Sequence, residues 1–197
     1  MELGSESYLA RVTLRDLVVI RLGVAVNLVI GQIVAALLLP VFLDAVGTML
    51  VAALVGPRAA IVAGLTSQVL AAVLSGNFTW LPFGVVQIVI ALYAWAAARA
   101  GAFRSLWTAL PAGLLLGALA GGTAAPIAYY LFGGATAGGV TAVTTALRAV
   151  GVPLPVAVGI SSIGTDLVDK TIAFGLVCLV LRHLPRHLAT RFPALAA

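Results

Sequence analysis

The chain has 197 residues, of which 62% are hydrophobic and 9% are charged, and its mean hydropathy is +1.18. This composition leaves too few polar side chains to cover a water-soluble globule, so it indicates an integral membrane protein. The apolar runs lack the period-two alternation of a membrane β-barrel, and the net charge of +5 fits contact with anionic lipid headgroups without any need for nucleic acid.

Six apolar segments are predicted in chain order, and a helix needs about 20 residues to cross the core of a bilayer. Pro40 follows the first segment, Gly56-Pro57 follows the second and Ser75-Gly76-Asn77 follows the third. The second segment is short for a full crossing, and residues 133–155 are expected to form a long connection with one short helix at about 141–150. The predicted segments cover residues 17–39, 42–55, 58–74, 82–99, 106–132 and 156–181.

The predicted fold is therefore all-α, an integral membrane bundle of six transmembrane helices. With the N-terminus inside, the outer side carries only Arg148, which is expected to meet water or headgroups, so both termini are predicted to be cytoplasmic. No small-residue cleavage site follows the first apolar run, so no removed signal peptide is expected. The predicted parts are a cytoplasmic segment (1–16), a transmembrane domain (17–184) and a cytoplasmic tail (185–197). The arginines on the inner side are Arg11, Arg15, Arg21, Arg58, Arg99, Arg104, Arg182, Arg186 and Arg191.

Two acids and a base interrupt the last apolar segment: Asp166, Asp169 and Lys170. Ionisable groups near the middle of a bilayer are costly, so these three are expected to face a shared protein or water-lined interior. Residues at i, i+4 and i+7 lie on one face of a helix, so Ser162 joins the two acids in one stripe, and Lys170 pairs with Asp166.

Polar side chains fall in the outer parts of the predicted segments, whereas the inner halves are almost wholly apolar or small. This pattern predicts a polar cavity that opens outward and is closed at its inner end, which suits capture of a small solute and does not suit a continuous pore. If its acids are ionised against one lysine, the cavity favours a cationic or donor-rich solute. The predicted substrate-binding residues are Asp44, Thr48, Gln68, Gln87, Ser162, Asp166, Asp169 and Lys170.

Purely structural roles are open for the same residues. The two acids and the lysine of the last segment could form a buried ion cluster that fixes helix packing. Asp44 could cap the short second helix, and the glutamines could bond between helices. The aromatic side chains Phe78, Trp80 and Trp107 are expected to anchor the chain at the membrane interface, without stacking on a substrate.

Four short stretches of the chain are similar to a known family: FLDAVGTML at 42–50, LVGPR at 54–58, DLVDK at 166–170 and LRHLP at 181–185. On these stretches, and on the six-segment pattern, the chain resembles the substrate-binding S component of energy-coupling factor (ECF) transporters over most of residues 17–193. The resemblance implies a helical bundle in a prokaryotic cytoplasmic membrane that captures a vitamin-like micronutrient at its outer face. Delivery would then need a membrane-embedded T subunit and a pair of ATPase subunits.

The resemblance also implies a docking face and a lid. In the family, small residues spaced Ala-x-x-x-Ala on the first helix contact the T subunit, and loops contribute to the lid over the substrate. Residues 38–43 and 77–81 are the corresponding candidates for gating. The corresponding residues of the docking face are Gly23, Asn27, Gly31 and Ala35, at four-residue steps.

Other classes of function fit the same residues less well. An intramembrane enzyme with Mg²⁺ at Asp166 and Asp169 is disfavoured, because Mg²⁺ needs further oxygen ligands and the usual zinc-protease and serine-hydrolase motifs are absent. No catalytic residue, metal or cofactor is therefore predicted. The chain has no P-loop, so any energy from ATP must come from partner subunits. A proton-coupled carrier that acts alone and a membrane sensor of the same architecture are the alternatives.

Overall fold

A computed structural model describes residues 13–37, 39–136 and 140–184, and every regular element in these ranges is a helix. The prediction of an all-helical fold is confirmed. Residues 1–12 of the predicted cytoplasmic segment (1–16), the predicted tail (185–197) and the start of the predicted lid at residue 38 lie outside the described residues. The α-helices, with 3₁₀ helices marked η, are α1 (Leu14–Ala36), α2 (Val46–Leu54), α3 (Pro57–Ser75), η1 (Phe78–Phe83), α4 (Gly84–Arg99), η2 (Ala102–Arg104), α5 (Leu106–Phe132), α6 (Val140–Ala149) and α7 (Leu154–Arg182).

Among the described residues, four helical stretches are long and apolar enough to cross a membrane: Leu14–Ala36, Pro57–Ser75, Phe78–Arg99 and Leu106–Phe132. Their outward faces carry large apolar side chains, as contact with lipid requires. Helix α2 has nine residues, which is less than half of a full crossing. Helix α7 has 29 residues and is long enough to cross a membrane. It is not among these four stretches because every 18-residue part of it contains both acids and the lysine. These helices indicate a multi-pass membrane protein.

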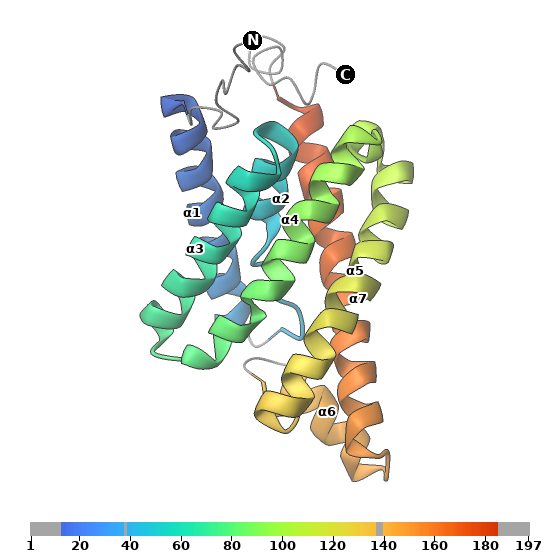
Figure 1. Cartoon of the computed structure of the whole chain (residues 1–197). Helices are drawn as coiled ribbons and strands as arrows, with labels where there is room; N and C mark the ends of the chain where they lie inside the picture. The colour runs from blue at the N-terminus through green and yellow to red at the C-terminus, as the bar shows by residue number, and fades with distance from the viewer. Residues whose placement is uncertain (1–12, 38, 137–139, 185–197) are drawn as a thin grey trace, which may run out of the picture.

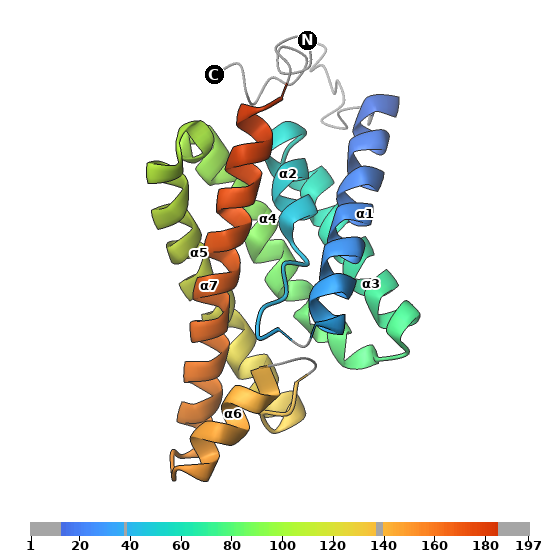
Figure 2. The ribbon, with the colours of Figure 1, turned by 180° about the vertical axis from the view of Figure 1, so that it is seen from behind.

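The helices run along one common direction with alternating polarity (Figure 1). Helices α1, α3 and α5 run away from the end of the bundle at which α1 begins, and α2, α4 and α7 run back toward it (Figures 1 and 2). We call this end the arginine end, because Arg15, Arg58, Arg99 and Arg182 lie in the first or last turn of their helices there. The opposite end, where α6 packs, is called the α6 end.

Helices α1 and α2 touch through their backbones. A Cβ atom on Gly47 would lie 1.9 Å from the carbonyl oxygen of Gly23, so neither glycine has room for a side chain. One turn further along α1, the Oδ1 atom of Asn27 accepts hydrogen bonds from the amides of Gly47 (2.7 Å) and Thr48 (3.3 Å). These amides belong to the first turn of α2, which leaves its N–H groups without partners inside the helix. Asn27 therefore caps α2, and Asp44 does not.

The small-residue stripe predicted for docking lies largely inside the chain. Gly23 and Asn27 are buried against α2, and the Nδ2 atom of Asn27 donates to Ser67 of α3 at 3.0 Å. Gly31 faces the Cβ atom of Asp44, and Ala35 is exposed. The first two positions thus serve packing within the chain and offer no free surface to a T subunit. Docking of a T subunit on this face of α1 stays a prediction.

Helices α5 and α7 form the tightest pair, along a second glycine stripe. Gly113, Gly117 and Gly121 recur at four-residue steps on α5 and face the backbone of α7. A Cβ atom on Gly117 would lie 2.5 Å from the carbonyl oxygen of Asp166 and 2.5 Å from the Cα atom of Leu167. Small residues at this spacing allow close approach of helices in membranes. The stripe consequently fixes which face of α7 points into the bundle.

Candidate functional site

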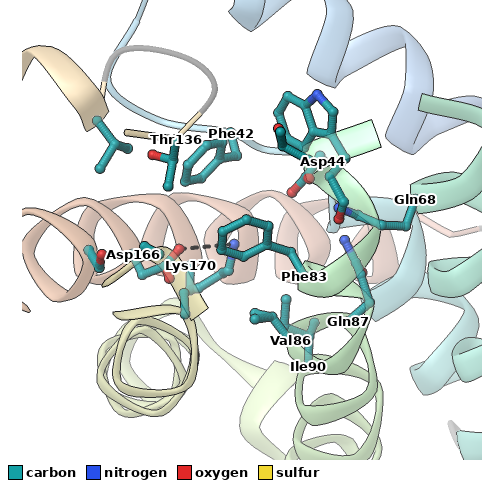
Figure 3. Close-up of a pocket in the computed structure, with 16 residues that line it drawn as sticks. Phe42, Asp44, Gln68, Phe83, Val86, Gln87, Ile90, Thr136, Asp166 and Lys170 are labelled. Atoms are coloured by element: carbon teal, nitrogen blue, oxygen red, sulfur yellow. Dashed lines mark hydrogen bonds and ion pairs between the residues drawn. The ribbon is translucent and has the colours of Figure 1, made fainter. Parts of the chain in front are cut away.

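A pocket lies between α3, η1, α4, α5 and α7, beneath the connection that joins α1 to α2 (Figure 3). The empty space between its walls amounts to about 650 Å³, including the part that opens to solvent. Toward the arginine end it is closed by buried apolar side chains such as Met49, Ala91 and Phe174. The pocket is lined by Phe42, Asp44, Gln68, Thr79, Trp80, Phe83, Val86, Gln87, Ile90, Ala124, Ala128, Thr136, Val140, Ser162, Asp166 and Lys170.

The structure brings most of the predicted substrate-binding residues to this pocket. Two of the predicted residues do not line it, Thr48 and Asp169. Thr48 is fully buried, and its hydroxyl donates to the Oε1 atom of Gln87 at 3.1 Å, so it positions a lining residue. The predicted residues that do line the pocket are Asp44, Gln68, Gln87, Ser162, Asp166 and Lys170.

Asp169 holds the connection between α1 and α2. Its Oδ1 atom accepts hydrogen bonds from the backbone amides of Phe42 (2.8 Å) and Leu43 (2.7 Å), and its Oδ2 atom pairs with the ammonium group of Lys170. Leu43 has φ +49°, a left-handed conformation that costs a non-glycine residue about 1–3 kcal/mol. Both carboxylate oxygens are thus engaged within the protein, which fits the packing interpretation for this acid and leaves no free oxygen for a metal or a solute.

Lys170 serves both acids of its own helix. Besides Asp169, it contacts the Oδ1 atom of Asp166 at 3.4 Å, and its ammonium nitrogen lies 6.0 Å from the ring centre of Phe42. The pairing with Asp166 that the helical spacing predicted is therefore present. Of the described residues in the wall of the pocket, Lys170 is the only basic one, and it is already shared between two carboxylates.

Several polar groups in the wall of the pocket have no partner among the described residues. The hydroxyl of Ser162 and the amide nitrogen of Gln87 make no hydrogen bond there, although these residues are only 6% and 3% exposed. The buried hydroxyl of Thr136 is also unpartnered within the described ranges. A buried polar group without a partner, such as the hydroxyl of Thr136, costs about 1–3 kcal/mol, so such groups are rare and call for an explanation. A polar molecule held in the pocket would supply their partners.

Asp44 has a carboxylate without a hydrogen bond or ion pair to any other described residue. It lines the pocket and also a second cavity of about 770 Å³, open space included, between α1 and α3. Phe42, Gln68 and Trp80 are likewise shared by the two cavities. The rings of Phe42 and Trp80 meet edge to face, with their centres 6.3 Å apart. This aromatic pair and Asp44 therefore stand between the two cavities.

The aromatic wall was missed by the sequence reasoning. Trp80 was expected at the membrane interface, but it lies in the pocket, where its carbonyl oxygen accepts from Gln68 at 2.7 Å. Phe83 lines the pocket as well and stacks on Phe132 with ring centres 5.9 Å apart. Phe78 is 62% exposed, as an interfacial anchor would be. No periodicity marks these rings, because they come from a 3₁₀ helix and an irregular connection.

Within the described ranges, no three His, Cys, Asp or Glu side chains gather as they would have to do to hold a metal ion. The arrangement has instead the features of a binding site for a small organic molecule: a concave apolar wall with a few polar groups that converge. Comparison with known proteins adds no assignment, because no family model, no curated protein and no solved structure matches this chain. The function is therefore argued from the pocket and from the chemistry of its walls.

Proposed function

We propose that this chain is a membrane-embedded solute-binding protein that captures a small polar molecule from the outer side of a cytoplasmic membrane. In this proposal each of five helices crosses the membrane once: α1, α3, α4, α5 and α7. The sixth pass consists of the connection after α1 followed by the short helix α2. The arginine end faces the cytoplasm, since arginine is enriched in cytoplasmic loops. The α6 end then faces the exterior.

The observation that carries the proposal is the set of unpartnered polar groups around an open pocket. Ser162, Gln87 and Thr136 offer donors and acceptors that no described residue uses. The polar wall lies toward the α6 half of α7, and the other half of α7 is buried among apolar side chains such as Phe174 and Val177. A site that is polar on one side and sealed by a dry core on the other suits binding from one face and does not suit free flow through the protein.

We further propose that the chain is an S component of an ECF transporter, which hands a vitamin-like solute to a T subunit driven by a pair of ATPase subunits. The sequence resemblance at 42–50 and 166–170 supports this, and these stretches supply Phe42, Asp44, Asp166 and Lys170 to the pocket. The chain offers no nucleotide-binding loop of its own.

Binding of a solute in this pocket is tested by native mass spectrometry of the full chain purified in lipid nanodiscs. We expect a small molecule to co-purify with the chain, and the variant Val86→Phe to lose it, because Val86 is 8% exposed and lines the pocket. The matched control is Val85→Phe, since the neighbouring Val85 is 54% exposed on the outer face of α4. Equal occupancy in both variants would place the solute elsewhere.

Coupling is tested by uptake of that co-purified molecule into cells, with the chain expressed alone or together with candidate T and ATPase subunits. We expect uptake only when all subunits are present, and its loss when the P-loop lysine of the ATPases is replaced. Full uptake by the chain alone would contradict the ECF assignment. It would favour the proton-coupled carrier, for which the buried pair of Asp166 and Lys170 offers a titrating group.

A further inference from the structure

We infer that the solute is a flat, positively charged molecule of the aromatic or heteroaromatic amine class, whose charge lies at Asp44 and whose ring lies against Phe42, Trp80 and Phe83. This inference rests on the proposed function and adds the chemical class of the solute. Three independent features of the pocket carry it: its charges, its rings and the positions of its unpartnered groups.

The charges of the site do not cancel within the described part of the chain. Asp169 is engaged by two backbone amides and by Lys170, and Lys170 also contacts Asp166. Asp44 makes no salt bridge and attracts Lys170 only at longer range, and the described residues of the pocket wall include no second basic side chain to neutralise it. An anionic solute would therefore meet two carboxylates and one lysine that is already shared. A cation supplies the missing partner of Asp44, and charge-assisted hydrogen bonds of this kind are about twice as strong as neutral ones.

The walls beside Asp44 are aromatic. Phe42 and Trp80 meet at 83° between their ring planes, and Phe83 is held in place by its stacked contact with Phe132. Aromatic rings attract both flat ring systems and cations, through stacking and cation–π contacts. Val86 and Ile90 complete an apolar floor. A saturated, open-chain polyol would leave these apolar walls without a matching surface.

The labelled polar groups of the pocket lie on two sides of Phe83 (Figure 3). Asp44, Gln68 and Gln87 lie on one side of Phe83, and Asp166 and Thr136 lie on the other. The amide nitrogen of Gln87 is free to donate because Thr48 already occupies its Oε1 atom. The solute is therefore expected to carry at one edge its cationic group together with an acceptor for the amide of Gln87, and a hydrogen-bonding substituent at the opposite edge.

The test uses three probes of nearly equal shape and different charge: benzamidinium, benzamide and benzoate. Their binding to the full chain in nanodiscs is measured by titration calorimetry and by the shift of the melting temperature. We expect benzamidinium to bind at least about tenfold more tightly than benzoate, with benzamide between them. In Asp44→Asn the preference for benzamidinium over benzamide should disappear. Asp16→Asn removes an acid at the arginine end, outside the pocket, and should change neither affinity.

A second variant keeps the test decisive if Asp44→Asn fails to fold. Gln87→Glu retains the acceptor for Thr48 and adds an acid beside the rings, so the preference for benzamidinium should increase by about tenfold. Benzoate binding as tightly as benzamidinium would overturn the inference, and so would a co-purified solute that is neutral or anionic at pH 7. In either case solute capture itself would stand. Loss of the proposed function would show differently, as a chain to which neither a probe nor a co-purified molecule binds.

Discussion

Replacing Gly117 by alanine is expected to lower the free energy of unfolding by about 3 kcal/mol, the upper part of the usual range for overpacking. The added methyl group would lie 2.5 Å from backbone atoms of α7, where an ordinary contact needs 3.4–4 Å. Backbone atoms of a helix cannot rotate out of the way as the end of a side chain can, so the two helices must move apart. Because Asp166 belongs to the backbone that moves, solute binding should weaken together with stability. Thermal unfolding in detergent and native mass spectrometry measure the two effects.

The control for this change stands five residues further along the same helix. Apart from the adjoining backbone of α5 itself, no described atom lies within 4 Å of the position that a methyl group on Gly122 would take, so Gly122→Ala meets open space. Alanine is favoured over glycine in helices by about 1 kcal/mol, and this variant should therefore be neutral or slightly more stable. A loss of stability in Gly122→Ala equal to that in Gly117→Ala would show that close packing of α5 on α7 is not the cause.

Replacing Asp169 by alanine is expected to cost about 3–5 kcal/mol, the range for removing one partner of a buried ion pair. Asp169 is fully buried, and its loss leaves the amides of Phe42 and Leu43 without their acceptor. The connection over the pocket should then open. Hydrogen exchange, followed by mass spectrometry on a peptide that contains Phe42 and Leu43, should be slow in the wild-type chain and fast in the variant.

The comparison variant is Asp166→Asn, on the same face of α7 one turn earlier. It removes an acid that contacts Lys170 and leaves the hydrogen bonds of Asp169 to the connection in place. Exchange at Phe42 and Leu43 should therefore stay slow, while solute affinity falls. Fast exchange in both variants would mean that the net charge of the cluster, and not the bonds from Asp169, keeps the connection closed.

The sequence predicted most helix limits because local signals set them. Gly76 has a positive φ after α3, and Pro57 begins that helix, so both ends follow from backbone chemistry alone. The start of α2 was placed at residue 42, but the helix begins at Val46. The residues before it are held by Asp169, which lies 127 residues from Phe42 along the chain. A contact over such a distance leaves no periodic trace in the sequence.

For the candidate site, the sequence predicted the buried face of the last helix but not the role of each side chain on it. Ionisable residues in an apolar helix mark an interior face, and the members of the predicted stripe, Ser162, Asp166 and Asp169, are all buried. Helical spacing does not tell which polar side chain meets a cavity and which meets another side chain. Thr48 and Asp169 have the same polarity as their neighbours in the pocket wall, yet both bond within the protein. Only the packing of the neighbouring helices decides which of these polar side chains lines the pocket and which bonds to another side chain.

The glycine stripe between α5 and α7 has a mechanical consequence. Where two backbones touch, no flexible side chains remain between them to absorb a shift, and packed interiors deform little. Helices α5 and α7 should therefore move as one rigid body, and the distances between Ser162, Asp166 and Lys170 should stay the same. Any motion that admits or releases a solute is then expected in the opposite wall of the pocket. That wall contains the strained Leu43 and the aromatic pair of Phe42 and Trp80.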